Sequence, residues 1–380
     1  MWYNVAMNNE NAVRILYVIP GLNVCGGMES YAMNYLRHID RSRYTIDFAT
    51  HDVGGENYVS EIEGLGGKVY VLPRFSLKNI KPIKAQIKNI LSENKYDIIH
   101  CHMANAGMFY FNEARKQGIK VRILHSHQSK AADKFSHAVR NYPLLWLAKI
   151  YATHFVACSK LAGDFLFGNE HYTLLNNAIE PEKFAPDIEA RKRIRDELGI
   201  TDDTLLLGHV GRLCPQKNQA FLLEVFKHIL DFHPDSKLVL IGEGEDEGLL
   251  KQKAMELGII DEVIFHGVER NVAAYYQAMD VFCMPSLYEG LSVVAVEAQG
   301  SGLPCIFSDD ISKETDLGGV VEFMSLKESP VEWAKKVVAL GHTDRVGDPS
   351  ELLDKSGYNI NLEAENLVKY YDKLLEITKN

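Results

Sequence analysis

Several features typical of membrane-spanning and secreted proteins are missing from this sequence. No apolar run reaches the roughly 18 to 20 residues that a membrane-spanning helix requires. The first eleven residues are polar and lack the basic-then-apolar pattern of a secretory signal. The six cysteines are scattered and form no C-x-x-C pair, a usage that favours reduced, buried thiols over disulfides. We therefore expect a cytoplasmic protein.

Charge is unevenly divided along the chain. Residues 1–178 carry 20 Lys and Arg against 14 Asp and Glu, whereas the remainder carries 21 against 37. The basic excess is concentrated in Arg74–Lys95, where only Glu93 opposes Arg74, Lys78, Lys81, Lys84, Lys88 and Lys95. Such a segment indicates either an ordinary solvated helix face or a peripheral contact with an anionic membrane.

Short β-branched runs alternate with amphipathic segments, a pattern typical of βαβ units and parallel sheets. We expect strands at Val13–Pro20, Tyr44–His51, Lys68–Pro73, Asp97–His102, Val121–His127, His154–Ser159, Tyr172–Asn177, Thr204–Gly211, Lys237–Gly242, Val263–Gly267, Asp280–Ser286, Pro304–Ser308 and Val320–Met324. Helical patterns include Met28–Ile39, Lys81–Ser92, Ser136–Ala152, Asp187–Leu198 and Leu362–Lys379.

A chain of 380 residues is too long for one ordinary core, so two domains are expected. Asn176, Asn177, Pro181 and Pro186 interrupt regular structure and place the boundary between 1–178 and 179–360, with a last helix over 361–380. The predicted fold class is α/β, with two Rossmann-like parallel-sheet domains. Ligands bind such sheets beyond the carboxyl ends of the strands, so candidate site residues should follow strands.

Four segments meet that criterion. The first is Gly26-Gly27-Met28-Glu29, which follows a strand and opens a helix. Glycines let a backbone approach a phosphate closely, and a helix N-terminus attracts anions. The alternative is a plain strand-to-helix turn.

The second segment, Gly211 to Asn218, carries Arg212 and Lys217 at the end of a strand. An arginine that binds in a bidentate manner and a lysine five residues later suit a diphosphate. An ordinary charged surface loop is the alternative.

The third segment runs from Ser286 through Glu289, Gly290, Leu291 and Ser292 into a helix that carries Glu297. Two carboxylates at the edge of a sheet can accept hydrogen bonds from sugar or ribose hydroxyls. The spacing places Glu297 about two turns into the helix, whose start at Leu291 and Ser292 would face a phosphate.

The fourth consists of His100 and His102 and of His125 and His127, each pair at the end of a strand. Residues i and i+2 share one face of a strand, so the two pairs point to one place. A zinc site is conceivable from the ligand type, but no spacing of the structural-zinc kind accompanies it. Binding of a substrate, or hydrogen bonds within the cluster, are the alternatives.

A fifth pattern, Gly242-Glu243-Gly244 with Gly248, is similar to a dinucleotide fingerprint. The loop also carries Glu243, Glu245, Asp246 and Glu247. This negative charge would repel a pyrophosphate, so we reject dinucleotide binding here. The chain also lacks the P-loop and G-x-S-x-G motifs.

Together the motifs resemble the family-4 retaining glycosyltransferases of the GT-B fold, in which two Rossmann-like domains face across a cleft. Gly211-Arg212 with Lys217-Asn218 matches the family's G-R-x4-K-N pattern, and Glu289 with Glu297 matches its E-x7-E motif. Gly26-Gly27 stands at the position of the donor-facing glycine loop, and His127 at that of a cleft histidine. The N-terminal details are most similar to cytoplasmic enzymes of bacterial capsule and exopolysaccharide assembly.

The resemblance implies a role for each matched residue. Arg212 and Lys217 would bind the donor diphosphate with Gly26, Gly27, Leu291 and Ser292. Glu297 would bind the ribose and Val268 the base, while Glu289 and Gly290 orient the donor sugar. His127 would contact a sugar hydroxyl, and the closing helix would return to the first domain.

The implied activity is transfer of a hexose, with retention, from a nucleoside-diphosphate sugar such as a UDP-sugar to a glycan or lipid-linked acceptor. The chain has no Asp-x-Asp motif, so we expect no metal and no cofactor, with cations of the protein neutralising the leaving group. No contact with nucleic acid is expected. Alternatives are a GT-B epimerase or phosphorylase acting on related substrates, or a two-lobed binding protein without catalysis.

Overall fold

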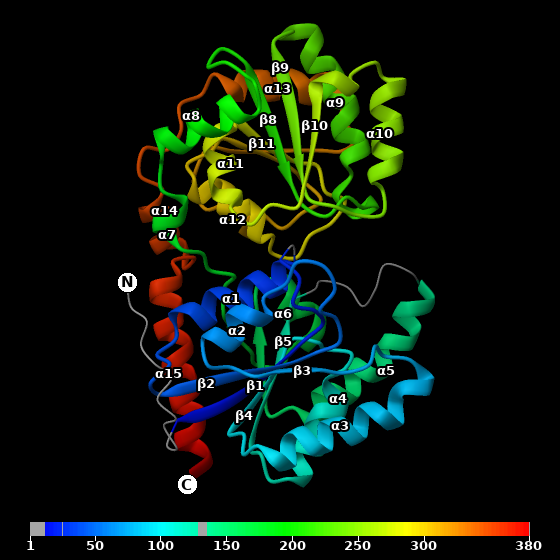
Figure 1. Cartoon of the computed structure of the whole chain (residues 1–380), viewed down its shortest axis with the longest axis vertical. Helices are drawn as coiled ribbons and strands as arrows, with labels where there is room; N and C mark the ends of the chain where they lie inside the picture. Colours follow the sequence, from blue (N-terminus) through cyan, green and yellow to red (C-terminus); the bar gives the residue numbers. More distant parts are fainter. Residues whose placement is uncertain (1–11, 25, 128–134, 380) are drawn as a thin grey trace. The chain divides into compact units, whose positions relative to one another are not determined.

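The computed structural model describes residues 12–24, 26–127 and 135–379. Two compact units divide the chain. The first contains residues up to Asn177 together with 360–380, and the second contains Ala178–Asn359. Each unit is an α/β structure built on one parallel sheet (Figure 1).

The sheet of the first unit has seven strands in the order β3-β2-β1-β4-β5-β6-β7, and every pairing is parallel. All seven strands lie where the sequence predicts them: β1 (Val13–Ile19), β2 (Tyr44–Thr50), β3 (Val69–Val71), β4 (Ile98–Cys101), β5 (Val121–Ser126), β6 (His154–Ala157) and β7 (Thr173–Leu174). The order reverses between β1 and β4, which is the topological switch point of a Rossmann-type sheet.

The helices of the first unit connect these strands. They are α1 (Gly27–His38), α2 (Val59–Gly64), α3 (Ile80–Glu93), α4 (Gly107–Lys116), α5 (Phe135–Tyr151), α6 (Lys160–Phe167) and α15 (Ile360–Lys379), with a 3-10 turn η1 (Leu77–Asn79). Residues that alternate along the strands, such as Leu16, Ile99 and Leu124, form an apolar core with α3, α4 and α5 (Figure 1).

The opposite face of this sheet carries polar and aromatic side chains among buried isoleucines, and α15 covers part of it. Tyr371 of α15 is buried and donates or accepts hydrogen bonds with Tyr17 of β1 and His100 of β4. At the surface, Asp372 forms an ion pair with Arg43. The last helix, which begins two residues earlier than the sequence indicates, is therefore part of the first unit's structure.

The second unit repeats the plan with six parallel strands in the order β10-β9-β8-β11-β12-β13. All six predicted strands are present: β8 (Leu205–Val210), β9 (Ser236–Ile241), β10 (Val263–Gly267), β11 (Val281–Met284), β12 (Cys305–Ser308) and β13 (Val321–Met324). The switch point lies between β8 and β11. The predicted α/β fold with two Rossmann-like parallel-sheet domains is confirmed.

The helices of the second unit lie on both faces of its sheet. They are α7 (Pro181–Phe184), α8 (Ile188–Glu197), α9 (Gln219–Phe232), α10 (Glu247–Glu256), α11 (Val272–Ala278), α12 (Val293–Gly300), α13 (Pro330–Gly341) and α14 (Ser350–Ser356), with 3-10 turns η2 (Pro215–Lys217), η3 (Ile260–Glu262) and η4 (Lys313–Thr315). Leucines of β8 and β9 pack with α9 and with Trp333 of α13, which is fully buried.

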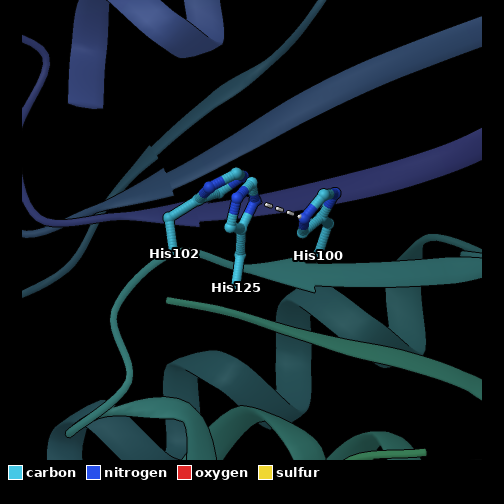
Figure 2. A group of neighbouring side chains, drawn as sticks. All are labelled: His100, His102 and His125. Atoms are coloured by element: carbon cyan, nitrogen blue, oxygen red, sulfur yellow. Dashed lines mark hydrogen bonds between the residues drawn. The ribbon is translucent and has the colours of Figure 1, made fainter. Parts of the chain in front are cut away.

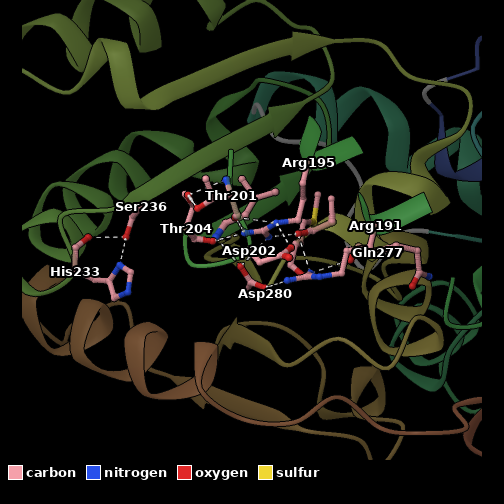
Figure 3. A network of polar contacts seen from close by, with 12 residues as sticks. Arg191, Arg195, Thr201, Asp202, Thr204, His233, Ser236, Gln277 and Asp280 are labelled. Atoms are coloured by element: carbon pink, nitrogen blue, oxygen red, sulfur yellow. Dashed lines mark hydrogen bonds and ion pairs between the residues drawn. The ribbon is translucent and has the colours of Figure 1, made fainter. Parts of the chain in front are cut away.

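A buried polar network fixes α8 at the amino end of this sheet (Figure 3). Asp280, which immediately precedes β11, accepts from Arg191 at 2.7 Å and from Arg195 at 3.2 Å. It also accepts from the backbone N–H of Leu206 at 2.8 Å. Because Arg195 is 2% exposed, its ion pair and hydrogen bonds offset part of the cost of removing the guanidinium from water. The network lies at the end of the strands opposite to the candidate site, so its role is structural.

Cys101, Cys158, Cys214, Cys283 and Cys305 are buried free thiols, whereas Cys25 lies outside the described residues. Among the helices that the structure describes, none combines the length and the apolar character needed to cross a bilayer.

Candidate functional site

The candidate site residues gather at the switch point of each sheet. Arg212 follows β8 and Glu289 follows β11, the two strands between which the second sheet reverses its order. In the first unit, Gly26 follows β1, and His102 and His127 follow β4 and β5. Parallel strands bring these loops to one edge of each sheet, where α/β proteins bind ligands.

Lys217 and Glu289 form a buried ion pair in the second unit. The Nζ atom of Lys217 lies 2.8 Å from Oε1 of Glu289, and the two side chains are 14% and 9% exposed. Gln216 donates at 3.3 Å to the second carboxylate oxygen and at 3.0 Å to the carbonyl of Tyr288. Two residues that the sequence assigns to separate motifs therefore share one contact. This contact joins a lysine, which can bind a phosphate, to a carboxylate, which can accept hydrogen bonds from hydroxyl groups.

Arg212 is exposed on the loop that follows β8. The carbonyl of Arg212 accepts from the side chain of Gln219 at 2.9 Å, and the same amide contacts Nε2 of buried His209 at 3.2 Å. His209 in turn donates from Nδ1 to the carbonyl of Cys283 at 2.8 Å. Burial lowers the pKa of His209 to about 4, so the ring is neutral near pH 7. This chain of contacts anchors the backbone beneath the Arg212 side chain.

The Gly242-x-Gly244 pattern has a packing role that the sequence does not reveal. A Cβ on Gly242 would lie 2.3 Å from the carbonyl oxygen of Gly211, and one on Gly244 would lie 2.2 Å from that of Leu213. Leu213 also exchanges backbone hydrogen bonds with Glu243 and Asp246 at 3.0 and 3.1 Å. The glycines therefore let the loop after β9 pack against the loop that carries Arg212.

Helix α12 begins at Val293, with Ser292 as its N-cap residue. Leu291 and Ser292 are buried, and the Ser292 hydroxyl contacts the sulfur of Met284 instead of capping the helix. Glu297 is the fifth residue of α12, so it lies just over one turn from the start, and the sequence-based estimate of two turns was wrong. The prediction counted from Glu289, but residues 289–292 form a non-helical approach to the helix.

Glu297 is partly buried and accepts a hydrogen bond from the Tyr276 hydroxyl at 3.1 Å. Burial raises the pKa of Glu297 to about 7, and the Tyr276 bond opposes that rise. Gly290 and Val268, the remaining predicted residues of this unit, are partly buried in the loops after β11 and β10. Because β10 is the edge strand, Val268 stands two strands away from β8.

In the first unit, Gly26 is the N-cap residue of α1 and Gly27 its first helical residue. The carboxyl group of Glu29 folds back over this turn, because a Cβ on Gly26 would lie 1.8 Å from Oε2. Burial raises the pKa of Glu29 to about 7, and the charge of Asp52 adds to the rise. The helix N-terminus predicted to attract phosphate thus already has a carboxyl group of the chain beside it.

The four histidines form a stack on the face of the first sheet that α1 and α15 cover. Neighbouring rings lie 4.0 to 5.1 Å apart between centroids, for example His125 and His127 at 4.0 Å. Nε2 of His100 is 3.0 Å from Nδ1 of His125 (Figure 2), and Nδ1 of His102 is 2.9 Å from Nε2 of His127. The predicted convergence of the two pairs is therefore present.

Burial keeps these imidazoles neutral. It lowers the pKa of His100 and of His127 to about 3, and the pKa values of His102 and His125 lie well below the usual range for the same reason. Ring nitrogens of His100, His102 and His125 lie within 4.8 Å of one another, and neutral imidazoles are good metal ligands. Both ring nitrogens of His100 are, however, already hydrogen-bonded, to Tyr371 and to His125, and a metal shared by the three histidines would have to replace one of those bonds.

The basic residues of the Arg74–Lys95 segment are exposed. Lys81, Lys84 and Lys88 project from α3, and Arg74 forms an exposed ion pair with Asp52 at 2.8 Å. On α5, which lies on the same face of the sheet, Tyr142, Trp146 and Ile150 are 57%, 63% and 54% exposed. These three residues are four positions apart, so they form one apolar stripe.

Comparison with known proteins identifies the family. A family model described as "Glycosyltransferase Family 4" matches residues 25–183, and one described as "Glycosyl transferases group 1" matches residues 190–317. The putative glycosyltransferase EpsF of Bacillus subtilis is 35% identical over 96% of this chain and 97% of its own length. The chain belongs to the family 4 glycosyltransferases. This glycosyltransferase is also 38% identical to an uncharacterized glycosyltransferase of Haemophilus influenzae, over 77% of this chain and 80% of that protein.

Solved structures confirm the GT-B fold of this family 4 glycosyltransferase. Anabaena Alr3699/HepE in complex with UDP and glucose has a TM-score of 0.78 at 15% identity, covering 95% of this chain and 99% of that one. Sucrose-phosphate synthase of Thermosynechococcus elongatus has a TM-score of 0.78 at 18% identity, covering 96% and 100%. The sequence-based prediction of a GT-B member of family 4 is therefore confirmed.

Sequence reasoning missed three residues that support this glycosyltransferase site. They are Gln219, which anchors the Arg212 backbone, Glu29, which lies over the glycine turn, and Tyr371, which contacts the histidine stack from α15. Glu29 lies within the Gly26-Gly27-Met28-Glu29 segment, so its position beside the glycine turn could have been predicted from the sequence. The other two act through contacts between segments distant in the sequence, which no local pattern signals.

Proposed function

We propose that this glycosyltransferase moves a hexose, with retention of configuration, from a UDP-sugar to a glycan or lipid-linked acceptor in the synthesis of a cell-surface polysaccharide. The observation that carries the proposal is the buried Lys217–Glu289 pair at the switch point of the second sheet. A cation and a carboxylate meet there, beside the loop of Arg212.

In this proposal Arg212 and Lys217 stabilise the diphosphate as it leaves. Preorganised cations at the position where charge develops lower the barrier of the chemical step. The backbone N–H groups of Leu291 and Ser292, which immediately precede α12, and those of Gly26 and Gly27 would add to this stabilisation. Glu289 accepts hydrogen bonds from hydroxyls of the donor sugar, while Gly290 leaves room for the ring.

The remaining contacts orient the donor. Glu297 would accept from ribose hydroxyls, Val268 would present its backbone to the base, and His127 would contact a hydroxyl of the sugar. Retention follows when the acceptor hydroxyl attacks from the face of the leaving group and its proton passes to an oxygen of the departing phosphate. The new glycosidic bond forms as the bond from the anomeric carbon to the phosphate oxygen breaks.

The named relatives support the choice of donor and acceptor. An Escherichia coli protein named UDP-Gal:alpha-D-GlcNAc-diphosphoundecaprenol alpha-1,3-galactosyltransferase is 30% identical over 60% of this chain and 62% of its own length. Its name combines a UDP-sugar with a lipid-linked acceptor. A Vi polysaccharide biosynthesis protein of Salmonella typhi is 31% identical over 36% of this chain and 24% of its own length.

The decisive test separates the function of the ion pair from its contribution to folding. Lys217→Met should lower kcat by roughly 10² to 10³, as loss of one preorganised donor does elsewhere. It also leaves the carboxylate of Glu289 without its cationic partner, which costs about 3–5 kcal/mol of stability. The double variant Lys217→Met/Glu289→Gln removes that penalty, so its melting temperature should recover while its turnover stays low. Full turnover in a folded double variant would contradict the proposal.

Ligand binding distinguishes the alternative functions. A UDP-sugar at 100 times its Kd should stabilise the wild type by about 2.7 kcal/mol, and Arg212→Ala should lose most of that effect. Isomerised sugar formed without an acceptor would indicate an epimerase. Tight binding of free sugars without nucleotides would indicate a binding protein.

Independence from metal is part of the proposal. The protein supplies two cations near the expected diphosphate, so turnover should be unchanged when a chelator is added to metal-free buffer. Loss of turnover on chelation, restored by a divalent cation, would assign the diphosphate to a metal instead.

We also propose that the first unit contacts an anionic membrane peripherally through the Arg74–Lys95 segment. Lys81, Lys84 and Lys88 contribute about 1 kcal/mol each near an anionic surface, and the aromatic stripe on α5 suits the interface of a bilayer. Reversal of these three lysines to Glu should abolish flotation with anionic vesicles, whereas reversal of exposed Lys192 and Lys355 should not. Flotation that persists after the triple reversal would exclude this contact.

A further inference from the structure

The buried polar groups of the first unit form two hydrogen-bonded series. In one, the Tyr17 hydroxyl bonds to Tyr371 at 2.9 Å, Tyr371 to Nδ1 of His100 at 2.7 Å, and Nε2 of His100 to Nδ1 of His125 at 3.0 Å. The other series is the 2.9 Å bond between His102 and His127. All except His127 are at most 2% exposed.

Three buried polar atoms here lack a hydrogen-bond partner in the described chain: one at an end of each series, and one on a neighbouring tyrosine. Nε2 of His125, Nε2 of His102 and the hydroxyl of Tyr31 are buried and have no hydrogen-bond partner among the described residues. The Tyr31 ring lies beside both imidazoles, 5.2 Å from His125 and 5.5 Å from His102 between centroids, and the two imidazoles are themselves 5.0 Å apart. A hydroxyl both donates and accepts, so Tyr31 is chemically suited to join the two series, directly or through one water molecule.

If Tyr31 joins the two series, they form one chain of hydrogen bonds, here called the relay. Each neutral imidazole carries one N–H and one lone pair, so every bond of the relay must be donated in the same direction. In the first direction, each group donates to the next from Tyr17 through Tyr371, His100, His125, Tyr31 and His102 to His127. In the opposite direction every bond is reversed, so Tyr17 accepts from Tyr371 and its own O–H lies outside the relay.

The Tyr17 end decides between the two directions. Tyr17 is 0% exposed, and its only hydroxyl partner in the described chain is Tyr371. If Tyr17 accepts from Tyr371, its own O–H has no acceptor, and a buried unsatisfied donor costs about 1–3 kcal/mol. If Tyr17 donates, only a lone pair is unused. The first direction is therefore favoured by roughly 5- to 150-fold.

We infer that His127 carries its proton on Nδ1, because His102 donates to its Nε2, and that it presents an N–H donor rather than a basic lone pair to its ligand. His102 is then a positioning residue. This inference rests on the proposed function in which His127 contacts the donor sugar. In that role His127 donates to a sugar oxygen and does not act as a general base, which suits a reaction whose proton passes to the departing phosphate.

The direct test is the tautomer of His127 in the intact protein. We expect ¹⁵N NMR of histidine-labelled enzyme near pH 7.5 to show a protonated Nδ1 and an unprotonated Nε2 for His127, with the signals assigned by comparison with His127→Gln. A protonated Nε2 would overturn the inference, and this measurement requires no variant of the relay and no activity.

Two variants of equal size test the role of His102. The amide of His102→Asn still donates near the original Nδ1 position, so it should keep the His127 tautomer and keep kcat within about threefold. The carboxylate of His102→Asp only accepts, so it should move the His127 proton to Nε2 and lower kcat about tenfold or more, equivalent to one hydrogen bond to a reacting group. His51→Asn is the control, because His51 is also buried but bonds to Pro73 and Tyr110 outside the relay, and it should leave the tautomer unchanged.

The outcomes separate the inference from the proposed function. If His102→Asp changes the tautomer while turnover stays at the wild-type level, the relay is confirmed and the contact of His127 with the sugar is wrong. If His102→Asn and His102→Asp show the same His127 tautomer, His102 does not set it and the inference fails.

Discussion

The histidine stack should make folding stability depend on pH in a way that one substitution can measure. His100 is 0% exposed, and burial lowers its pKa to about 3 in the folded state, whereas an unfolded chain has a histidine pKa of about 6.5. Below pH 6.5 the unfolded state therefore binds the proton and the folded state does not. Stability from this group is complete above pH 6.5 and is lost as the pH falls toward 3.

At pH 5.5 the solution lies one unit below the unfolded pKa, so His100 alone should cost on the order of 1.4 kcal/mol relative to pH 7.5. Glu29 and Glu297 oppose this trend, because burial raises their pKa values to about 7 and protonation stabilises their folded forms. The total slope mixes both effects. The informative quantity is the difference between the wild type and a variant that lacks one histidine.

His100→Asn removes the titrating ring and retains a polar group toward Tyr371. Denaturant unfolding at pH 7.5 and 5.5 should show that the wild type loses about 1.4 kcal/mol more than this variant over that interval. His171→Gln is the control, because that side chain is exposed, and its pH dependence should equal that of the wild type. An identical loss in the wild type and His100→Asn would refute the reasoning.

Three further predictions follow from other contacts. Gly244→Ala places a Cβ against the Leu213 carbonyl, so it should lower stability by about 1–3 kcal/mol and weaken UDP binding in calorimetry, whereas Gly248→Ala, with open space around it, should do neither. Asp280→Asn leaves buried Arg195 without its carboxylate and should cost about 3–5 kcal/mol in denaturant unfolding, with an unchanged Kd for UDP because the network lies at the opposite end of the sheet. Glu29→Gln should remove a contribution to stability that is present at pH 5 and is lost as the pH rises through about 7, so the free energy of unfolding at pH 5 minus that at pH 8 should be lower in the variant than in the wild type; an equal value would contradict burial of an ionisable carboxyl group.

The sequence predicted the strands more completely than the contacts of the site. Buried parallel strands appear in the sequence as short β-branched runs, so twelve of the thirteen begin and end within two residues of their expected bounds. The exception is β7 (Thr173–Leu174), which ends three residues before the expected Asn177. The rule that site residues follow strands also worked, because it depends only on topology. The predicted start of α12 was less accurate. Residues 289–292 precede the helix, so Glu297 lies closer to the helix start than the sequence indicated.

Contacts between side chains of distant segments could not be predicted from the sequence. The Lys217–Glu289 contact depends on the adjacency of β8 and β11, which are separated by β9 and β10 along the chain. The glycines of Gly242-x-Gly244 were considered only as a dinucleotide pattern and rejected, and the backbone of another loop that packs against them was not foreseen. Which groups meet is decided by the order of strands in the sheet, and a local pattern does not contain that order.

The place of α15 in the chain has a consequence for biosynthesis. Residues 178–359 are continuous and can fold as soon as they leave the ribosome, whereas the first unit is assembled from two segments on either side of them. Tyr371, which contacts His100 beneath the sheet, is translated after the whole second unit. The first unit, whose first segment is translated before the second unit, can therefore complete its fold only after the second unit has been translated.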